Sequence, residues 1–104
     1  MLCLKVEPHL APYPVDVEDN LQSLQNEVDG FIEVVYPLKD EPIAIICNEE
    51  GKLLNLEPNR TLYDDQGYPL DVICGTFLVV GLEEDHFTSL DQRQIHLLSM
   101  LLED

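Results

Sequence analysis

The hydrophobic positions of this chain follow strand-like runs over most of its length and helical spacing in two places. The sequence LCLKVEP at residues 2–8 alternates weakly between apolar and polar side chains and ends in a proline, so it predicts a first strand. Leu21, Leu24 and Val28 then recur at helical spacing, which predicts a short amphipathic helix. The chain therefore opens with a strand followed by a helix.

Both ends of this helix carry residues that favour a boundary. Asp16, Asp19 or Asn20 can cap the amino end, and Gly30 suits a left-handed position at the carboxyl end. The β-branched and aromatic run FIEVVYPL at residues 31–38 follows at once and predicts a second strand. A strand, a helix and a strand in this order favour a right-handed crossover that lays the two strands parallel.

A hairpin is predicted in the next segment. Residues 43–47 form an apolar incoming strand, the sequence NEEG supplies the turn with Gly51 available for a positive φ, and residues 52–56 form the return strand. A long polar connection follows. Its sequence DDQG at residues 64–67 is a second turn signal, which allows a small hairpin around it.

The last third of the chain holds the strongest strand and a final helix. The nearly all-apolar run VICGTFLVVG at residues 72–81 predicts the central strand of the sheet, covered on both faces. An acidic loop leads to the helix, for which Thr88 or Ser89 is the expected N-cap and Ser89 with Gln92 matches a capping box. The apolar stripe expected to be buried on this helix consists of Leu90, Ile95, Leu98, Leu101 and Leu102.

These elements predict an α+β fold in a single domain, residues 1–104. We expect about five strands in a mixed sheet with a βαβ-like start, a hairpin and a C-terminal helix, and both helices packed on the sheet. A chain of 104 residues supports one hydrophobic core, and its apolar content of 45% is ordinary for a globular protein.

No segment of the chain predicts insertion into a membrane. No apolar run reaches the ~20 residues that span a bilayer. The amino-terminal sequence MLCLKVEPHL is interrupted by charge too early for a secretory signal. We therefore expect a soluble protein of the cytoplasm.

Charge is the feature of the composition that departs furthest from the ordinary. The chain has 21 acidic and 5 basic residues and a formal net charge of −16. A net charge with a magnitude of only about 2 to 8 is enough to keep a small domain soluble. Such an excess repels nucleic acid and anionic membranes and attracts basic surfaces. Direct nucleic-acid binding is not expected, because the basic residues are isolated and form no track for phosphates. They are Lys5, Lys39, Lys52, Arg60 and Arg93.

Residues that carry catalysis in other proteins are scattered here, so neither an enzyme nor a cofactor is predicted. The sequence has no GxGxxG, no phosphate loop ending in GK[ST], no HExxH and no GxSxG. His86 stands beside the carboxylates of residues 83–85, yet no set of metal ligands has a recognisable spacing, and His9 and His96 are distant in sequence. No metal site is predicted.

The three cysteines fit a structural role. Cys3, Cys47 and Cys74 are widely spaced and lie among aliphatic residues, which fits neither a disulfide framework nor a zinc site. Cys74 with a histidine is formally a nucleophile and its base, but the apolar run around it predicts a buried, unreactive thiol. All three are therefore interpreted as small buried side chains.

Acidic residues on turns are the predicted partner-binding surface. Carboxylates held on the turns of a rigid sheet can present a row of negative charge to a basic groove, in place of a phosphate backbone. A solvated acidic face without a partner is the alternative that the sequence leaves open. The predicted partner-binding residues are Glu49, Glu50, Glu57, Asp64, Asp65, Glu83, Glu84 and Asp85, and Asp40 with Glu41 forms a further acidic group.

Four polar residues of the predicted hairpin region form a separate candidate cluster: Asn48, Lys52, Asn59 and Arg60. They either bind a small ligand or stabilise the local structure. For Asn59 and Arg60 the favoured interpretation is structural, with hydrogen bonds to backbone carbonyls or to a carboxylate that hold the following loop in place.

Four blocks of the chain resemble a small family of domains of unknown function from phages, conjugative plasmids and other mobile elements of gut Firmicutes. The blocks are LQSLQNEVDGFIEVVYPL, AIICNEEGKLLNLEPNR, DVICGTFLVVG and FTSLDQRQI, which together extend over most of residues 21–95. Where the family pattern reads Leu-Pro-x-Asn-Arg, this chain has LEPNR at residues 56–60, with an added glutamate. The resemblance implies no catalytic residues.

In size and charge the chain is also similar to anti-CRISPR proteins that inhibit Cas9. The resemblance implies an anti-defence protein of a phage or mobile element that acts in the bacterial cytoplasm. Its expected partner is Cas9, the guide-RNA complex of Cas9, or a related nucleic-acid enzyme, bound through the acidic surface as a mimic of DNA. Two alternatives stay open: a non-inhibitory interaction module of mobile-element replication or transfer, and a small-ligand binder that uses residues 48–60. Monomer and dimer are both open.

Overall fold

The computed structural model describes residues 1–38 and 40–103. Its elements in chain order are β1 (Leu2–Val6), β2 (Tyr13–Asp16), α1 (Leu21–Val28), β3 (Ile32–Val35), β4 (Ile43–Asn48), β5 (Pro58–Tyr63), β6 (Pro69–Cys74), β7 (Phe77–Glu83), β8 (His86–Thr88) and α2 (Gln92–Leu101).

Within the described residues the main sheet has six strands. Five of them run in the spatial order β2-β1-β7-β4-β3, and β8 pairs with β7. Every pairing is antiparallel. The central strand expected within residues 72–81 is confirmed from Phe77 onward, since β7 lies in the middle of the sheet and its first five residues are buried. Residues 72–74 belong instead to β6, because Gly75, with a φ of 85°, ends that strand.

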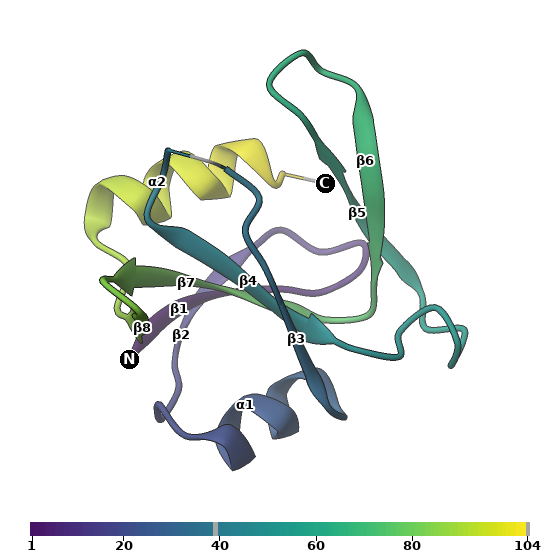
Figure 1. Cartoon of the computed structure of the whole chain (residues 1–104), viewed down its shortest axis with the longest axis horizontal. Coiled ribbons are helices and arrows are strands. Elements are labelled where there is room, and N and C mark those ends of the chain that lie inside the picture. The colour runs from purple at the N-terminus through teal and green to yellow at the C-terminus, as the bar shows by residue number, and fades with distance from the viewer. Residues whose placement is uncertain (39, 104) are drawn as a thin grey trace.

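Two hydrophobic clusters lie on opposite faces of this sheet, because successive side chains of a strand point to opposite sides. α1 covers one face, with Leu24 and Val28 packed against Ala44 and Ile46 of β4. α2 and the base of the β5–β6 hairpin cover the other face, where Leu98 belongs to the core. Figure 1 shows α1 and α2 on opposite sides of the sheet and the β5–β6 hairpin extending away from it.

The α+β class, the two helices and the C-terminal position of the second helix are confirmed. The βαβ-like start of a mixed sheet is wrong, because the proline-rich segment after β1 forms β2 and pairs antiparallel with β1. α1 then connects β2 at one edge of the sheet to β3 at the other. Pro14 is tolerated in β2 because an edge strand need not donate every backbone N–H to a ladder.

The hairpin predicted over residues 43–56 is also wrong in position. The incoming strand is present as β4, which is fully buried, but its neighbours are β3 and β7, and residues 49–55 form turns where the return strand was expected. Gly51 does not have a positive φ; a Cβ there would lie 2.7 Å from the Cys74 carbonyl oxygen. Its lack of a side chain permits this close approach of two backbone segments.

The hairpin of the structure is β5–β6, around the second turn signal at residues 64–67. The Asp64 Oδ1 atom accepts from the backbone N–H groups of Gln66 and Tyr68, and Gly67 has a φ of 85°. The acidic loop expected before the final helix contains another hairpin, because residues 81–83 pair with residues 86–88.

The helix ends differ in part from the expected ones. Asn20 is the N-cap of α1, one of the three candidates, and its Oδ1 atom accepts from the Ser23 N–H at 2.8 Å. Asp29, not Gly30, has the left-handed conformation at the carboxyl end. Gly30 is needed for space instead, since a Cβ there would lie 2.7 Å from the Asn48 Nδ2 atom.

The N-cap of α2 is Asp91, which forms a capping box with Gln94. The expected Ser89 and Gln92 pair is therefore wrong by two residues. The Ser89 hydroxyl accepts from the Leu2 N–H at 2.8 Å and so holds the connection after β8 against β1. The stripe expected to be buried is correct except at Leu101, which is 65% exposed.

Asp91→Ala should lower the free energy of unfolding by about 1 kcal/mol, because the Gln94 N–H in the first turn of α2 loses its side-chain acceptor. Gln92→Ala is the matched control and should change stability by less than about 0.5 kcal/mol. Urea unfolding followed by circular dichroism measures both. A larger loss for Gln92→Ala than for Asp91→Ala would contradict the cap seen in the structure.

Candidate functional site

Asn48 closes the carboxyl end of α1. Its side chain is buried, and the Nδ2 group donates to the carbonyls of Val28 at 3.1 Å and Asp29 at 3.3 Å. Its Oδ1 atom accepts from the Glu50 N–H at 2.8 Å, which starts the turn after β4. The side chain has donors and acceptors satisfied inside the protein, so its role is structural.

Asn59 and Arg60 join four parts of the chain. The Asn59 Nδ2 group donates to the carbonyls of Val6 and Gly75, both at 2.9 Å. The Arg60 Nε group donates to the carbonyl of Leu102 at 2.8 Å, and one terminal nitrogen donates to the carbonyl of Leu10 at 2.7 Å. Both residues bind backbone carbonyls, which is one of the two kinds of partner predicted, but these carbonyls do not belong to the segment that follows residue 60.

Lys52 is the exposed member of the polar cluster, and it forms an ion pair with Asp71 of β6. The hydrogen bond between the two raises the pKa of Lys52 and lowers the pKa of Asp71. Such an exposed pair contributes little to stability. It does connect the turn after β4 to the β5–β6 hairpin.

A hollow of about 300 Å³ lies beside this ion pair. Its walls come from β3, the end of β4 with the turn after it, Leu62 of β5, and β6, of which residues 70–74 all line it. Since side chains alternate across a strand, a run of consecutive lining residues means that β6 turns its edge toward the hollow. Glu33, Glu49 and Asp71 are the carboxylates that line it.

A second hollow of about 870 Å³ lies next to the first and shares Tyr36, Pro37 and Leu70 with it. We call the two together the acidic groove. Four more carboxylates line the second hollow, from the connection before β4 and the tip of the β5–β6 hairpin: Asp40, Glu41, Asp64 and Asp65. Lys52 is the single cation among the described lining residues, and Lys39 lies outside the described part of the chain.

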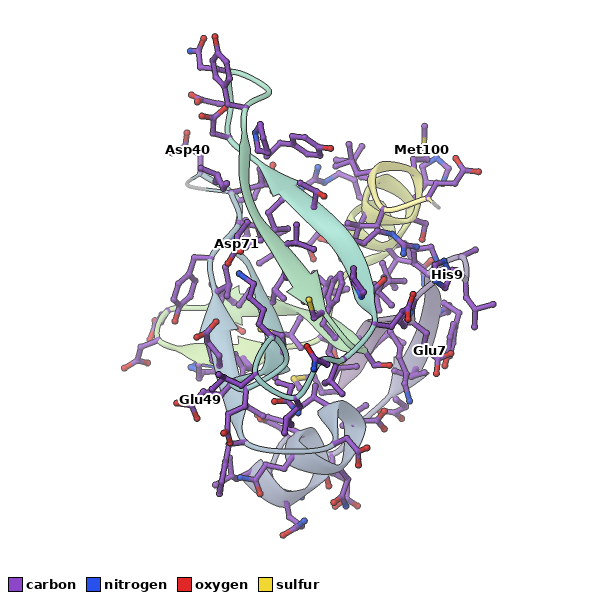
Figure 2. All side chains as sticks on the ribbon, turned by 90° about the vertical axis from the view of Figure 1, so that its right-hand side faces the viewer. Glu7, His9, Asp40, Glu49, Asp71 and Met100 are labelled. Atoms are coloured by element: carbon purple, nitrogen blue, oxygen red, sulfur yellow. The ribbon has the colours of Figure 1, made fainter. Side chains whose placement is uncertain are left out.

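Figure 2 labels three of the residues that line the groove, and they lie on one side of the view. Asp40, Asp71 and Glu49 follow one another from the region of the hairpin tip toward α1, while Glu7 and His9 lie on the other side of the view. The carboxylates at the two ends of the groove belong to turns, and the middle is lined by β3 and β6.

The structure divides the predicted partner-binding residues into separate places. Glu49, Asp64 and Asp65 line the acidic groove, and Glu50 is exposed in the turn next to Glu49. Glu57 binds the exposed His9 ring at 2.9 Å instead. Residues 83–85 are exposed around the β7–β8 turn. The polar cluster is divided as well, because Asn48 and Lys52 line the first hollow whereas Asn59 and Arg60 line neither.

Several groove residues were not among the predicted site residues: Glu33, Tyr36, Leu70 and Asp71. The sequence did contain two features that mark these positions. Glu33 is a lone charge inside an otherwise apolar strand, and Leu70 is an apolar residue close to the turn signal at residues 64–67. Their convergence depends on the packing of β6 opposite β3, which no local pattern specifies.

Neither a metal site nor a membrane-spanning segment is found within residues 1–38 and 40–103. No three histidine, cysteine, aspartate or glutamate side chains are arranged to hold a metal ion. None of the helices in this part of the chain has the length and hydropathy to cross a bilayer.

The cysteines differ in accessibility. Cys3 and Cys47 are buried, and this burial raises the pKa of each thiol to about 11. Cys74 is half-buried and lines the first hollow of the acidic groove. The prediction of buried thiols is therefore confirmed for two cysteines and wrong for Cys74, because β6 belongs to the exposed hairpin and not to the central strand.

The sequence pattern of a family described as a domain of unknown function, DUF3846, matches residues 1–103. A comparison with curated proteins and a comparison with solved structures each found no match.

Arg60→Met should lower the free energy of unfolding by about 3 kcal/mol, because the carbonyls of Leu10 and Leu102 lose the charged donor that the buried Arg60 side chain supplies. Arg93→Met is the control: Arg93 is exposed, 3.6 Å from a Glu41 oxygen, and its loss should cost less than about 0.5 kcal/mol. Urea unfolding compares the two variants. Equal stability of the two variants would contradict the structural role of Arg60, and Arg60 would again be a candidate for binding a ligand.

Iodoacetamide should modify Cys74 first in the folded protein. Iodoacetamide reacts with the thiolate form of cysteine. Because the thiols of Cys3 and Cys47 have a pKa of about 11, only about one in a thousand of them is ionised at pH 8. Mass spectrometry of timed samples gives the order of modification, and the denatured protein is the control, in which all three should react. Equal rates for the three cysteines in the folded protein would contradict the burial described here.

Proposed function

Since the chain belongs to the DUF3846 family, whose function is unknown, we propose a function from the acidic groove: the protein binds a basic surface of a nucleic-acid enzyme. The biological form that we propose is an anti-defence protein of a phage or mobile element. In this role it inhibits Cas9, the guide-RNA complex of Cas9, or a related enzyme in the bacterial cytoplasm.

The composition of the groove is the observation that carries this proposal. Carboxylates line both hollows, and the one described cation among them, Lys52, is already paired with Asp71. Exposed apolar side chains stand between the charges, with Tyr36 and Leu70 common to both hollows. A surface that combines an excess of carboxylates with apolar contacts suits a protein partner with lysine or arginine side chains.

Enzymes that bind nucleic acid present such basic surfaces to phosphates. A rigid acidic protein that occupies the surface excludes the nucleic acid by competition for the same cations. The affinity of the complex should decrease as the salt concentration rises, because exposed charges more than ~8 Å apart are screened at physiological ionic strength. The net charge of −16 additionally accelerates the encounter with a basic partner.

The small-ligand alternative has less support. It required the four polar side chains to converge on one pocket, but Asn59 and Arg60 are directed to backbone carbonyls away from the groove. The non-inhibitory interaction module uses the same groove chemistry, and it differs from the main proposal in the consequence of binding.

Reversal of the groove charge tests the function. The triple variant Glu49→Lys, Asp64→Lys, Asp65→Lys should bind purified Cas9–guide-RNA complex at least about tenfold more weakly than the wild type does, because three attractive contacts become repulsive. DNA cleavage in the presence of each protein measures inhibition, and calorimetry measures binding at low and at physiological salt.

The matched control is Glu83→Lys, Glu84→Lys, Asp85→Lys, which has the same net charge but alters the β7–β8 turn outside the groove. It should inhibit like the wild type. Equal loss in both triple variants would indicate a response to net charge alone and would overturn the groove as the site. Binding without inhibition of cleavage would favour the non-inhibitory module. Absence of binding by the wild type would exclude Cas9 as the partner.

A further inference from the structure

β3 leaves one side of its backbone without a neighbouring strand. Within the described residues it pairs only with β4. The Glu49 N–H donates to the Phe31 carbonyl at 2.8 Å, so the pair of Phe31 and Glu49 is a hydrogen-bonded one. Because bonded and non-bonded pairs alternate along an antiparallel ladder, the backbone groups of Ile32 and Val34 point away from β4. They form an open strand edge beside the acidic groove.

The opposite wall of the groove has a strand edge too, but that edge is occupied. β6 pairs only with β5 in the described chain. The Val72 N–H, however, donates to the Asp71 Oδ1 atom at 2.8 Å, and the same carboxylate binds Lys52. Charged side chains placed in this way are a common protection of edge strands. The difference between the two edges singles out β3 as the one able to accept another strand.

The side chains of β3 suit an extended partner. Glu33 and Val35 line the groove, and two large aromatic side chains flank the strand, Phe31 at 64% and Tyr36 at 65% exposure. An added strand would place alternate side chains over the groove, roughly 7 Å apart. There they would meet Glu33 and the other groove carboxylates.

We infer that β3 binds an extended segment of a basic partner as an additional strand of the main sheet, with alternate lysine or arginine side chains directed into the acidic groove. Main-chain hydrogen bonds to residues 32–34 supply affinity, and the groove carboxylates select the side chains. The inference rests on the proposed function, because charge complementarity identifies the occupant. A second copy of this chain is disfavoured, since it would bring two surfaces of a protein with net charge −16 together.

Val34→Pro tests this binding mode, because proline removes the N–H that points away from β4 and an edge strand tolerates it there. Val34→Ala is the matched control, since it also loses the partly buried side chain but keeps the N–H. The probe is a synthetic peptide of about eight residues, enough to extend past β3, with alternating lysine and valine and blocked ends. Val34→Pro should bind it at least about tenfold more weakly than Val34→Ala does.

A second probe needs no protein variant and covers the case in which Val34→Pro fails to fold. It is the same peptide with N-methyl groups on alternate backbone amides, which keeps every charge but removes the donors on one edge. Two such peptides, methylated on the odd or on the even amides, should differ about tenfold or more in affinity for the wild-type protein, because only one edge faces β3. Shifts of the amide signals of residues 32–36 in NMR spectra should locate the bound peptide.

The outcomes separate this inference from the proposed function. Equal affinity of all the peptides, with loss of binding in the Glu49, Asp64 and Asp65 triple variant, would overturn strand addition and leave the acidic groove as a binding site. Equal affinity with full binding by the triple variant would overturn both. A dimer that dissociates on Val34→Pro would replace the basic partner by a second copy of the chain and so overturn the inference.

Discussion

The buried guanidinium of Arg60 connects the parts of the molecule that the main sheet does not. It is only 8% exposed and donates to carbonyls of the β1–β2 connection and of the end of α2, while Asn59 beside it reaches the end of β1. A cation is costly to remove from water unless its donors are satisfied. The hairpin, the connection and the helix must therefore adopt their positions together, and the base of the β5–β6 hairpin is fixed on the sheet.

The acidic groove is a consequence of this anchoring. The hairpin is attached at its base, where Ile73 enters the core, and its outer part extends away from the main sheet. The space between β6 and β3 stays open, and turns at its two ends carry carboxylates. Repulsion among these charges is moderate because they are solvated, and the Lys52–Asp71 pair offsets part of it.

The net charge of the protein affects which partners can pair with the open edge of β3. An edge strand flanked by exposed aromatic residues is a site for pairing between copies of a protein. Here a net charge of −16 opposes contact between copies, whereas it favours contact with a basic chain. The same charge therefore protects the edge from self-association and leaves it available to a partner of opposite charge.

Local patterns were enough to predict which segments form the helices, the strands β4 and β7, and Asn20 as one of three candidate caps, and they favoured a structural interpretation of Asn59 and Arg60. These features depend on side-chain period, capping and hydrogen-bonding capacity, which are properties of a few adjacent residues. The partners of the strands, the place of the hairpin and the acidic groove were decided by tertiary structure. Glu33, Glu49 and Asp71 are far apart in sequence, and they meet only because antiparallel pairing and the Arg60 contacts bring β6 opposite β3.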